Sequence, residues 1–366
     1  MSNLHAISAS SQSVWSDQIS RAMLENGELR QLIEEDGISG VTSNPSIFAN
    51  AITKSTDYDG VIAQLAGAGA TTVAIYTELV KRDIQDACDV LLPIWAGSEK
   101  RDGHVSVEVS PLLAHDTAGT IADARAWWDR VDRQNLLIKV PATEAGLPAI
   151  EQLISEGISV NVTLIFSLDR YRAVTGAFLS GLERLIADGR DPSAVSSVAS
   201  FFVSRFDSEV DQRLEALGSE PALALRGKGA VANAQAAYGA FLEIFQGYRW
   251  DRLATSGAQL QRPLWASTST KNPDYDDLLY VEPLIVEHTV NTMPLSTVDA
   301  YRDHGNPNPQ QFGADEIASA VSTLGSLSQV GIDYDDVVQV LEDEGVDKFA
   351  VSYRELLDGI AEQAKL

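Results

Sequence analysis

One lysine of this sequence lies inside an apolar stretch. The chain has eight lysines, and Lys139 alone stands within a strand-like run, Leu-Leu-Ile-Lys-Val-Pro at 136–141. Burying a lysine is costly unless the group is paired or neutral. Burial favours the neutral amine, which is the form that attacks a carbonyl. On its own, the segment is equally consistent with a catalytic lysine and with a lysine paired structurally to a barrel carboxylate.

Polar side chains alternate with apolar ones in two further strand-like segments. At 105–110 the valines take one face and polar residues the other, and 159–164 repeats this pattern. Alternation turns such polar faces into the lumen of a closed barrel, where bulky branched residues are usual. A polar lumen therefore indicates a site, although any single member could be a strand-end cap. The set comprises Ser106, Glu108, Ser110, Ser159, Asn161 and Thr163, with Asp17 ending the first predicted strand and Asn44 following the second.

Hydroxyl and basic side chains gather around the ends of two later predicted strands. Arginine grips a phosphate with a forked, bidentate pair of donors, so this pattern favours a phosphate site. The alternative for Arg205 is an ion pair at a helix start with Asp207 or Glu209. The residues are Ser200 and Arg205 around the sixth strand, and Ser267, Ser269 and Lys271 around the seventh.

Eight short apolar or alternating segments recur along the chain, with amphipathic helical patterns such as 71–92 and 168–186 between them. Strands alternating with helices favour a parallel sheet, and eight such units favour a closed (β/α)8 TIM barrel of the α/β class. We expect one barrel domain over 1–366. Two or three extra helices should pack outside it, at 312–327, 333–342 and 348–364. The predicted strands are 13–17, 37–42, 104–109, 136–140, 159–164, 194–201, 264–267 and 288–291.

The charge of the chain limits its partners. It holds 27 basic and 52 acidic residues, a formal net charge of −25. Nucleic-acid binding needs basic patches, so this balance argues against it. Because the overall field is negative, a phosphorylated substrate would require a local cluster of hydrogen-bond donors. The five histidines are dispersed, which makes a metal site improbable.

Cysteine usage and hydropathy indicate a cytoplasmic protein. Cys88 is the one cysteine, so no intramolecular disulfide can form, and its helical pattern predicts a core position. The polar N-terminus lacks the apolar region of a signal peptide. No apolar run reaches the ~18 residues of a membrane span, so we expect no membrane contact.

Three segments resemble signatures of the transaldolase family. They are Gly-Val-Thr-Ser-Asn-Pro-Ser-Ile-Phe at 40–48, Leu-Leu-Ile-Lys-Val-Pro-Ala-Thr-Glu-Ala-Gly-Leu at 136–147 and Asn-Val-Thr-Leu-Ile-Phe-Ser at 161–167. The resemblance runs from about Val14 to Tyr353. The length of the chain, together with Trp-Ala-Ser-Thr-Ser-Thr-Lys-Asn-Pro at 265–273, is similar to the longer bacterial subfamily.

This resemblance implies a class I, Schiff-base-forming transaldolase of the pentose phosphate pathway. Lys139 would form an imine with the ketose C2 carbonyl, and Asp17 would take and return the C4 hydroxyl proton. Glu108 and Thr163 would hold a catalytic water. No cofactor or metal is implied, because the protonated imine is the electron sink. Substrate-binding residues would be Asn44 and Asn161 for dihydroxyacetone, Ser200 and Arg205 for phosphate, Ser267 or Lys271 as a further phosphate ligand, and Phe202 as a wall.

Donors implied by the resemblance are fructose 6-phosphate and sedoheptulose 7-phosphate, and acceptors are erythrose 4-phosphate and glyceraldehyde 3-phosphate. Some family members carry a second arginine after the seventh strand, where this chain has Ser-Thr-Ser-Thr-Lys at 267–271. An aldolase that releases dihydroxyacetone is the alternative enzyme. A non-catalytic barrel that binds sugar phosphates or a protein is the alternative of another class. The oligomeric state stays open between monomer and homodimer.

Overall fold

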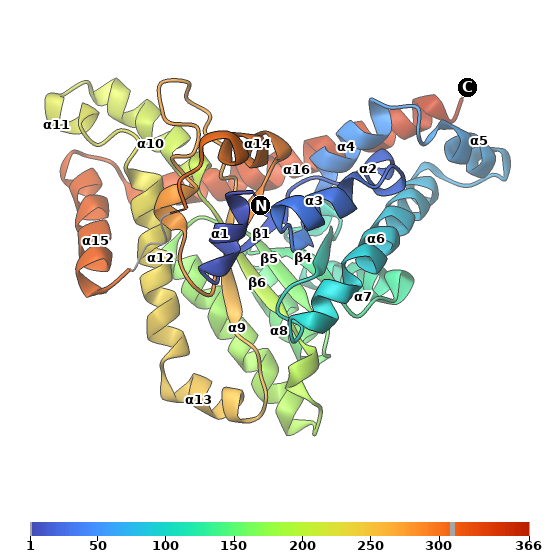
Figure 1. Cartoon of the computed structure of the whole chain (residues 1–366), viewed down its shortest axis with the longest axis horizontal. Coiled ribbons are helices and arrows are strands. Elements are labelled where there is room, and N and C mark those ends of the chain that lie inside the picture. The colour runs from blue at the N-terminus through green and yellow to red at the C-terminus, as the bar shows by residue number, and fades with distance from the viewer. Residues whose placement is uncertain (1, 308–311, 366) are drawn as a thin grey trace.

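The chain folds into a closed barrel of parallel strands, which confirms the predicted (β/α)8 architecture (Figure 1). The computed structural model describes residues 2–307 and 312–365. Neighbours in sequence are neighbours in the barrel, and β8 closes it by pairing with β1. The strands are β1 (Ser13–Ser16), β2 (Gly40–Val41), β3 (His104–Glu108), β4 (Leu136–Pro141), β5 (Val160–Ile165), β6 (Ser197–Phe202), β7 (Gln261–Ala266) and β8 (Val290–Met293).

Several predicted strand limits were wrong. The second strand shortens to Gly40–Val41, because Gly37 adopts a left-handed conformation that ends the preceding helix. The sixth begins at Ser197, because Pro192–Ala194 form a 3-10 turn instead of extended chain. The seventh and eighth are displaced along the sequence to the limits given above.

Helices cover the outside of the barrel, and both helical patterns singled out in the sequence are confirmed as α6 and α9. Side-chain caps start them: the Thr71 hydroxyl accepts from Ala74 N, and that of Ser167 accepts from Arg170 N. The helices before the C-terminal pair are α1 (Leu4–Ala9), α2 (Arg21–Glu25), α3 (Glu28–Asp36), α4 (Pro45–Thr53), α5 (Asp59–Gly67), α6 (Thr72–Gly97), α7 (Thr117–Val131), α8 (Gly146–Ser155), α9 (Leu168–Ala187), α10 (Ser204–Leu217), α11 (Glu220–Leu223), α12 (Gly229–Phe245), α13 (Tyr248–Thr255) and α14 (Leu295–His304).

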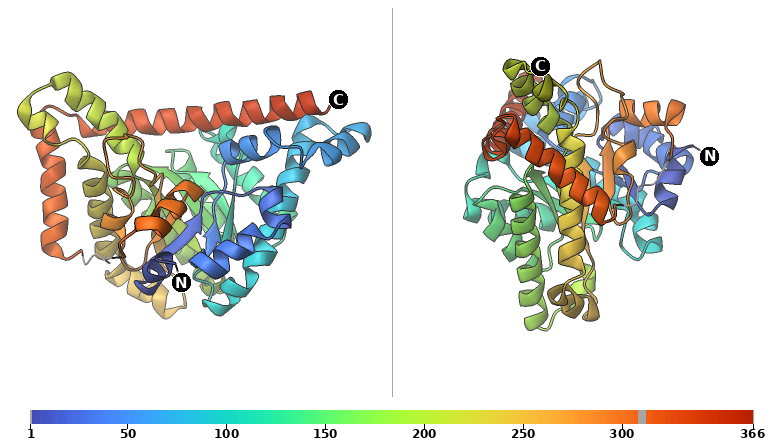
Figure 2. Two further views of the ribbon diagram at one scale, coloured as in Figure 1. Left: turned by 45° about the horizontal axis from the view of Figure 1, so that its top comes forward. Right: turned by 90° about the vertical axis from the view of Figure 1, so that its left-hand side faces the viewer.

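Two long helices end the chain, within the predicted two or three, but their limits and their place differ from the prediction. The first is α15 (Ala314–Gln329), which packs on α12 at the outside of the barrel. The predicted helices 333–342 and 348–364 are one continuous helix, α16 (Tyr334–Gln363). Figure 2 shows α16 running along one end of the barrel. It contacts α4, α6, α10 and the strand β5, so it covers the strand ends instead of packing only outside.

Gly345 explains the continuity of α16. A glycine inside a helix weakens it, which is why the sequence pattern breaks there. In the fold, however, a Cβ at this position would lie 3.0 Å from the Leu164 side chain. The missing side chain therefore lets α16 pack closely against the end of β5.

The core is continuous from the barrel to the surrounding helices. Cys88 is fully buried in it, as predicted. Among the residues described, no helix is long and apolar enough to span a membrane.

Candidate active site

Lys139 lies at the centre of the barrel lumen beside a carboxylate. Its Nζ is 3.6 Å from Oε2 of Glu108, and both side chains are only 5% exposed. The two residues are register partners on β4 and β3, so parallel pairing places them on the same inward face. Lys139 Nζ also donates a 3.2 Å hydrogen bond to the Ser43 carbonyl. The lysine is therefore held in place without a bidentate ion pair.

The Glu108 carboxyl titrates in the physiological range. Burial raises its pKa to about 7, and the nearby Lys139 and Arg205 charges oppose this rise while Asp17 adds to it. Oε2 of Glu108 and Oγ1 of Thr163 are buried and accept or donate no hydrogen bond among the described residues. A carboxyl with this pKa can both take and give a proton near neutral pH.

Asp17 follows β1 and faces the same lumen. Thr42 donates a 2.6 Å hydrogen bond to its Oδ1, and the Thr42 hydroxyl lies 2.7 Å from that of Thr292. These threonines come from the ends of β2 and β8, the two neighbours of β1. The Asp17 carboxylate is thus oriented toward the cavity by strands on both sides.

Three hydrogen-bonded side chains link β3, β5 and β6 inside the barrel. Asn161 donates to the Ser106 hydroxyl at 3.0 Å, and its Oδ1 accepts from the Ser200 hydroxyl at 2.7 Å. These bonds fix the Asn161 amide between β3 and β6. Ser110, which the alternation also assigned to the lumen, lies elsewhere: its backbone N–H donates to Asp123 of α7. The alternation fails there because β3 ends at Glu108.

These side chains border a cavity of about 210 Å³ at the carboxyl ends of the strands. Its wall includes the predicted residues Asp17, Asn44, Lys139, Thr163, Ser200, Phe202, Arg205, Ser267 and Lys271. Glu108 and Asn161 lie just outside this wall, in direct contact with Lys139 and Ser200. The structure therefore brings all eleven residues of the predicted site to one place.

Arg205 occupies the end of the cavity formed by α10. Its guanidinium lies 5.1 Å from the ring centroid of Phe202 and 5.9 Å from that of Phe349. Burial lowers its pKa, and its NH1 is buried without a hydrogen-bond partner among the described residues. The alternative ion pair is not formed, because Glu209 pairs with Arg213 and Asp207 bonds Tyr280.

The loop after β7 brings a second cation to the same end. Lys271 Nζ donates to the Ser269 hydroxyl at 2.5 Å, and burial together with the Arg205 charge lowers the Lys271 pKa. Ser267 directly follows β7 and has a left-handed φ of 57°, and its hydroxyl lies 3.0 Å from that of Ser204 at the start of α10. Two cations and several hydroxyls thus converge in an otherwise acidic chain.

Asn44 has a structural role as well as a place in the cavity wall. Its Oδ1 accepts from Ile47 N at 3.0 Å and caps α4, and Pro45 follows at the first helical position. The cap fixes the amide at the mouth of the barrel. Its Nδ2 group makes no hydrogen bond with a described residue and can face a ligand.

Residues 14–360 match the family described as transaldolase/fructose-6-phosphate aldolase. The chain belongs to this family. A transaldolase of Mycolicibacterium smegmatis is 52% identical over 356 residues, which cover 97% of this chain and 96% of the relative. The transaldolase of Arthrobacter sp. strain FB24 is 52% identical over 95% of this chain and 94% of its own length. That of Thermobifida fusca is 51% identical over 99% and 98%.

These full-length matches confirm the resemblance to the longer bacterial transaldolases and the predicted transaldolase activity. Sequence reasoning nevertheless missed five wall residues: Thr42, Ala266, Thr292, Pro294 and Phe349. Thr42 lies within the second-strand signature and could have been found there. Phe349 gives no local signal, because it reaches the cavity from α16, whose place over the barrel depends on tertiary packing.

Proposed function

We propose that the cavity transfers a dihydroxyacetone unit from a ketose phosphate to an aldose phosphate through an imine on Lys139. The observation that carries this proposal is the position of the Lys139 amine. It lies in the lumen beside Glu108, at a cavity whose wall also includes Arg205 and Lys271. A carbonyl carbon can therefore meet the amine while a phosphate meets the cations.

Imine formation needs proton transfers at the lysine and at the carbonyl oxygen. The neutral amine attacks C2, and the carbinolamine then loses its hydroxyl as water. Glu108 accepts the proton that leaves the nitrogen and returns a proton to the departing oxygen, through a water that Thr163 also binds. The carboxyl pKa of about 7 suits both directions of this exchange.

Carbon–carbon cleavage follows at the protonated imine, which accepts the electron pair of the breaking C3–C4 bond. Asp17 takes the C4 hydroxyl proton, and C4 becomes the aldehyde of the departing aldose phosphate. The three-carbon enamine stays on Lys139, held by the Asn44 and Asn161 amides. An acceptor aldehyde then adds to the enamine carbon, and Asp17 returns its proton to the new hydroxyl.

The phosphate of either substrate lies at the end of the cavity that faces α10. Arg205 supplies a forked guanidinium, and Lys271 takes the place of the second arginine that some relatives carry. Ser200 and Ser267 add hydroxyl donors, and Phe202 forms the wall beneath the guanidinium. The donors in this proposal are fructose 6-phosphate and sedoheptulose 7-phosphate, and the acceptors are erythrose 4-phosphate and glyceraldehyde 3-phosphate.

Three broader statements accompany this proposal. The chain acts in the cytoplasm, as a monomer or a homodimer, in the pentose phosphate pathway. It forms one barrel domain over 1–366, which the packing of α16 on α4, α6 and α10 supports, because the last helix is part of the barrel's end. Neither a cofactor nor a metal is needed for the steps above.

Borohydride reduction in the presence of fructose 6-phosphate tests the proposal. We expect a stable adduct on Lys139, identified by peptide mass spectrometry. The absence of any adduct, or an adduct on Lys271 only, would contradict it. Product analysis with and without erythrose 4-phosphate then separates transfer from the aldolase alternative, in which free dihydroxyacetone accumulates at the same rate under both conditions.

A further inference from the structure

The β7–β8 loop, residues 267–289, is fastened to α10 by two aspartate–tyrosine pairs. The Tyr280 hydroxyl donates to Oδ2 of Asp207 at 3.1 Å, and the Tyr275 hydroxyl donates to Oδ2 of Asp211 at 2.6 Å. The two aspartates lie one turn apart on α10, on the same face of the helix. The loop is thus attached along α10 at two successive points.

Each aspartate also uses its other oxygen to hold a third segment. Oδ1 of Asp207 accepts from Ala230 N at 2.7 Å, and Oδ1 of Asp211 accepts from Gly227 N at 3.0 Å. Gly227 has a left-handed φ of 69°, and a Cβ there would lie 3.0 Å from the Tyr275 ring. Two carboxylates therefore join α10 to the loop and to the start of α12. The Tyr275 ring packs against Gly227, where the absence of a side chain leaves room for it.

The two joined elements are those that carry the cations of the cavity. Arg205 lies in the first turn of α10, two residues before Asp207, and Lys271 lies four residues before Tyr275 in the loop. The Arg205 charge lowers the Lys271 pKa, so the two cations repel each other. A loop free of α10 would relax away from this repulsion.

We propose that Tyr275 and Asp211 are positioning residues, which hold Lys271 and Ser269 of the loop at a fixed spacing from Arg205. This inference rests on the proposed function, in which that end of the cavity binds the substrate phosphate. Neither Tyr275 nor Asp211 borders the cavity, so they act through the loop and not on the substrate.

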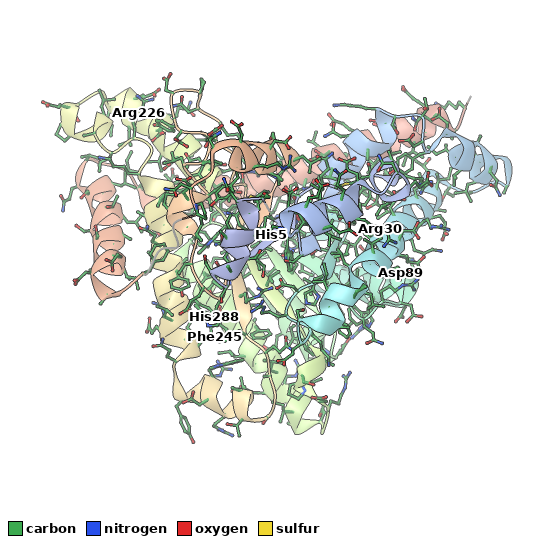
Figure 3. All side chains as sticks on the ribbon, in the orientation of Figure 1. His5, Arg30, Asp89, Arg226, Phe245 and His288 are labelled. Carbon is green, nitrogen blue, oxygen red and sulfur yellow. The ribbon has the colours of Figure 1, made fainter. Side chains whose placement is uncertain are left out.

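Of the two pairs, Tyr275–Asp211 is the better one to test. Asp207 and Tyr280 are buried, and burial with the nearby Asp211 charge raises the Asp207 pKa to about 7, so changes there also disturb folding. Tyr275 is half-buried. Arg226, labelled in Figure 3, lies near the Asp211 carboxyl from the α11–α12 connection and pairs with Glu215 of α10. Its charge can stabilise Asp211 when the tyrosine hydroxyl is removed.

The experiment measures borohydride-trapped adduct on Lys139 as a function of donor concentration, with fructose 6-phosphate and with dihydroxyacetone. Tyr275→Phe and Asp211→Ala should raise the half-saturating fructose 6-phosphate concentration about 3- to 10-fold, as the loss of one hydrogen bond implies. Half-saturation by dihydroxyacetone, which has no phosphate, should not change. Asp211→Asn keeps a group that can bond both Gly227 N–H and the tyrosine, so it should largely restore the unaltered value.

Asp336→Asn is the matched control, because it breaks an exposed ion pair between α16 and Arg213 of the same helix α10. It should change neither half-saturation. An unchanged fructose 6-phosphate response in Tyr275→Phe overturns the inference, as does an equal rise for both donors. If the unaltered protein forms no Lys139 adduct with either donor, the proposed function itself fails, and the inference fails with it.

Discussion

Glu108→Gln should make the protein more stable at alkaline pH and much less active. The Glu108 side chain is 5% exposed, and burial raises its pKa to about 7 from an ordinary 4.5. The fold therefore holds the carboxyl proton more tightly than the unfolded chain does. The stability that this proton contributes is complete below pH 4.5 and is lost as the pH rises through 7.

The size of the effect follows from the two pKa values. Their difference corresponds to about 3 kcal/mol of unfolding free energy once the pH is well above 7. The lowest pH of the unfolding measurements is set at 5.5, because it lies above the pI of about 4.4. Of the loss in unfolding free energy, about 2 kcal/mol falls between pH 5.5 and pH 8. Glutamine has the shape of the protonated acid and does not titrate, so the variant should escape this loss.

Urea unfolding at pH 5.5 and pH 8 measures the effect, with wild-type protein, Glu108→Gln and the exposed control Glu144→Gln compared at each pH. Other titrating groups cancel in the comparison because all three proteins share them. Turnover should fall by a factor of about 10²–10⁴ in Glu108→Gln. The plot of turnover rate against pH should also lose its rise near pH 7. Identical pH dependence of unfolding in wild type and Glu108→Gln would refute the reasoning.

Three further predictions concern the other site residues. Lys139→Met should abolish turnover and adduct formation while keeping the circular dichroism spectrum of the fold, and any trapped adduct in this variant would disprove the assignment. Arg205→Ala should raise KM for phosphorylated donors about 10- to 150-fold, as loss of a charge-assisted pair implies, and should spare dihydroxyacetone; equal loss for both donors would make Arg205 structural. Asp17→Ala should stall after imine formation, so that intact-mass analysis after borohydride finds the full-length sugar phosphate on Lys139; a three-carbon adduct would show that cleavage does not need Asp17.

The inward residues of β3 and β5 could be predicted from the sequence, because alternation reports directly which face is inward. Glu108 and Lys139 are register partners in the fold, as two inward residues of neighbouring strands should be. The ends of strands were harder. In β5 the pairing with β6 shifts between Val162 and Ile165, and Leu164 has a φ of 60°. Such irregularity depends on neighbouring elements, and local pattern does not reveal it.

The C-terminal region shows the limit of local propensity more clearly. The sequence around Gly345 predicts a break, yet α16 continues because the glycine allows close contact with Leu164. This helix also contributes to the site, because the ring centroid of Phe349 lies 5.6 Å from Lys139 Nζ. Phe349 lies within the predicted helix 348–364, so it was the position of this helix over the barrel that local pattern could not reveal.

Binding of a sugar phosphate by a chain of net charge −25 must depend on local geometry. The long-range field repels the ligand, and salt weakens that field beyond about 10 Å. Within the cavity, Arg205 and Lys271 are partly desolvated, which strengthens their attraction for a phosphate but also their mutual repulsion. In the proposed binding mode, a phosphate between them relieves that repulsion. If this proposal holds, affinity depends on how rigidly α10 and the β7–β8 loop keep the two cations together before the substrate arrives.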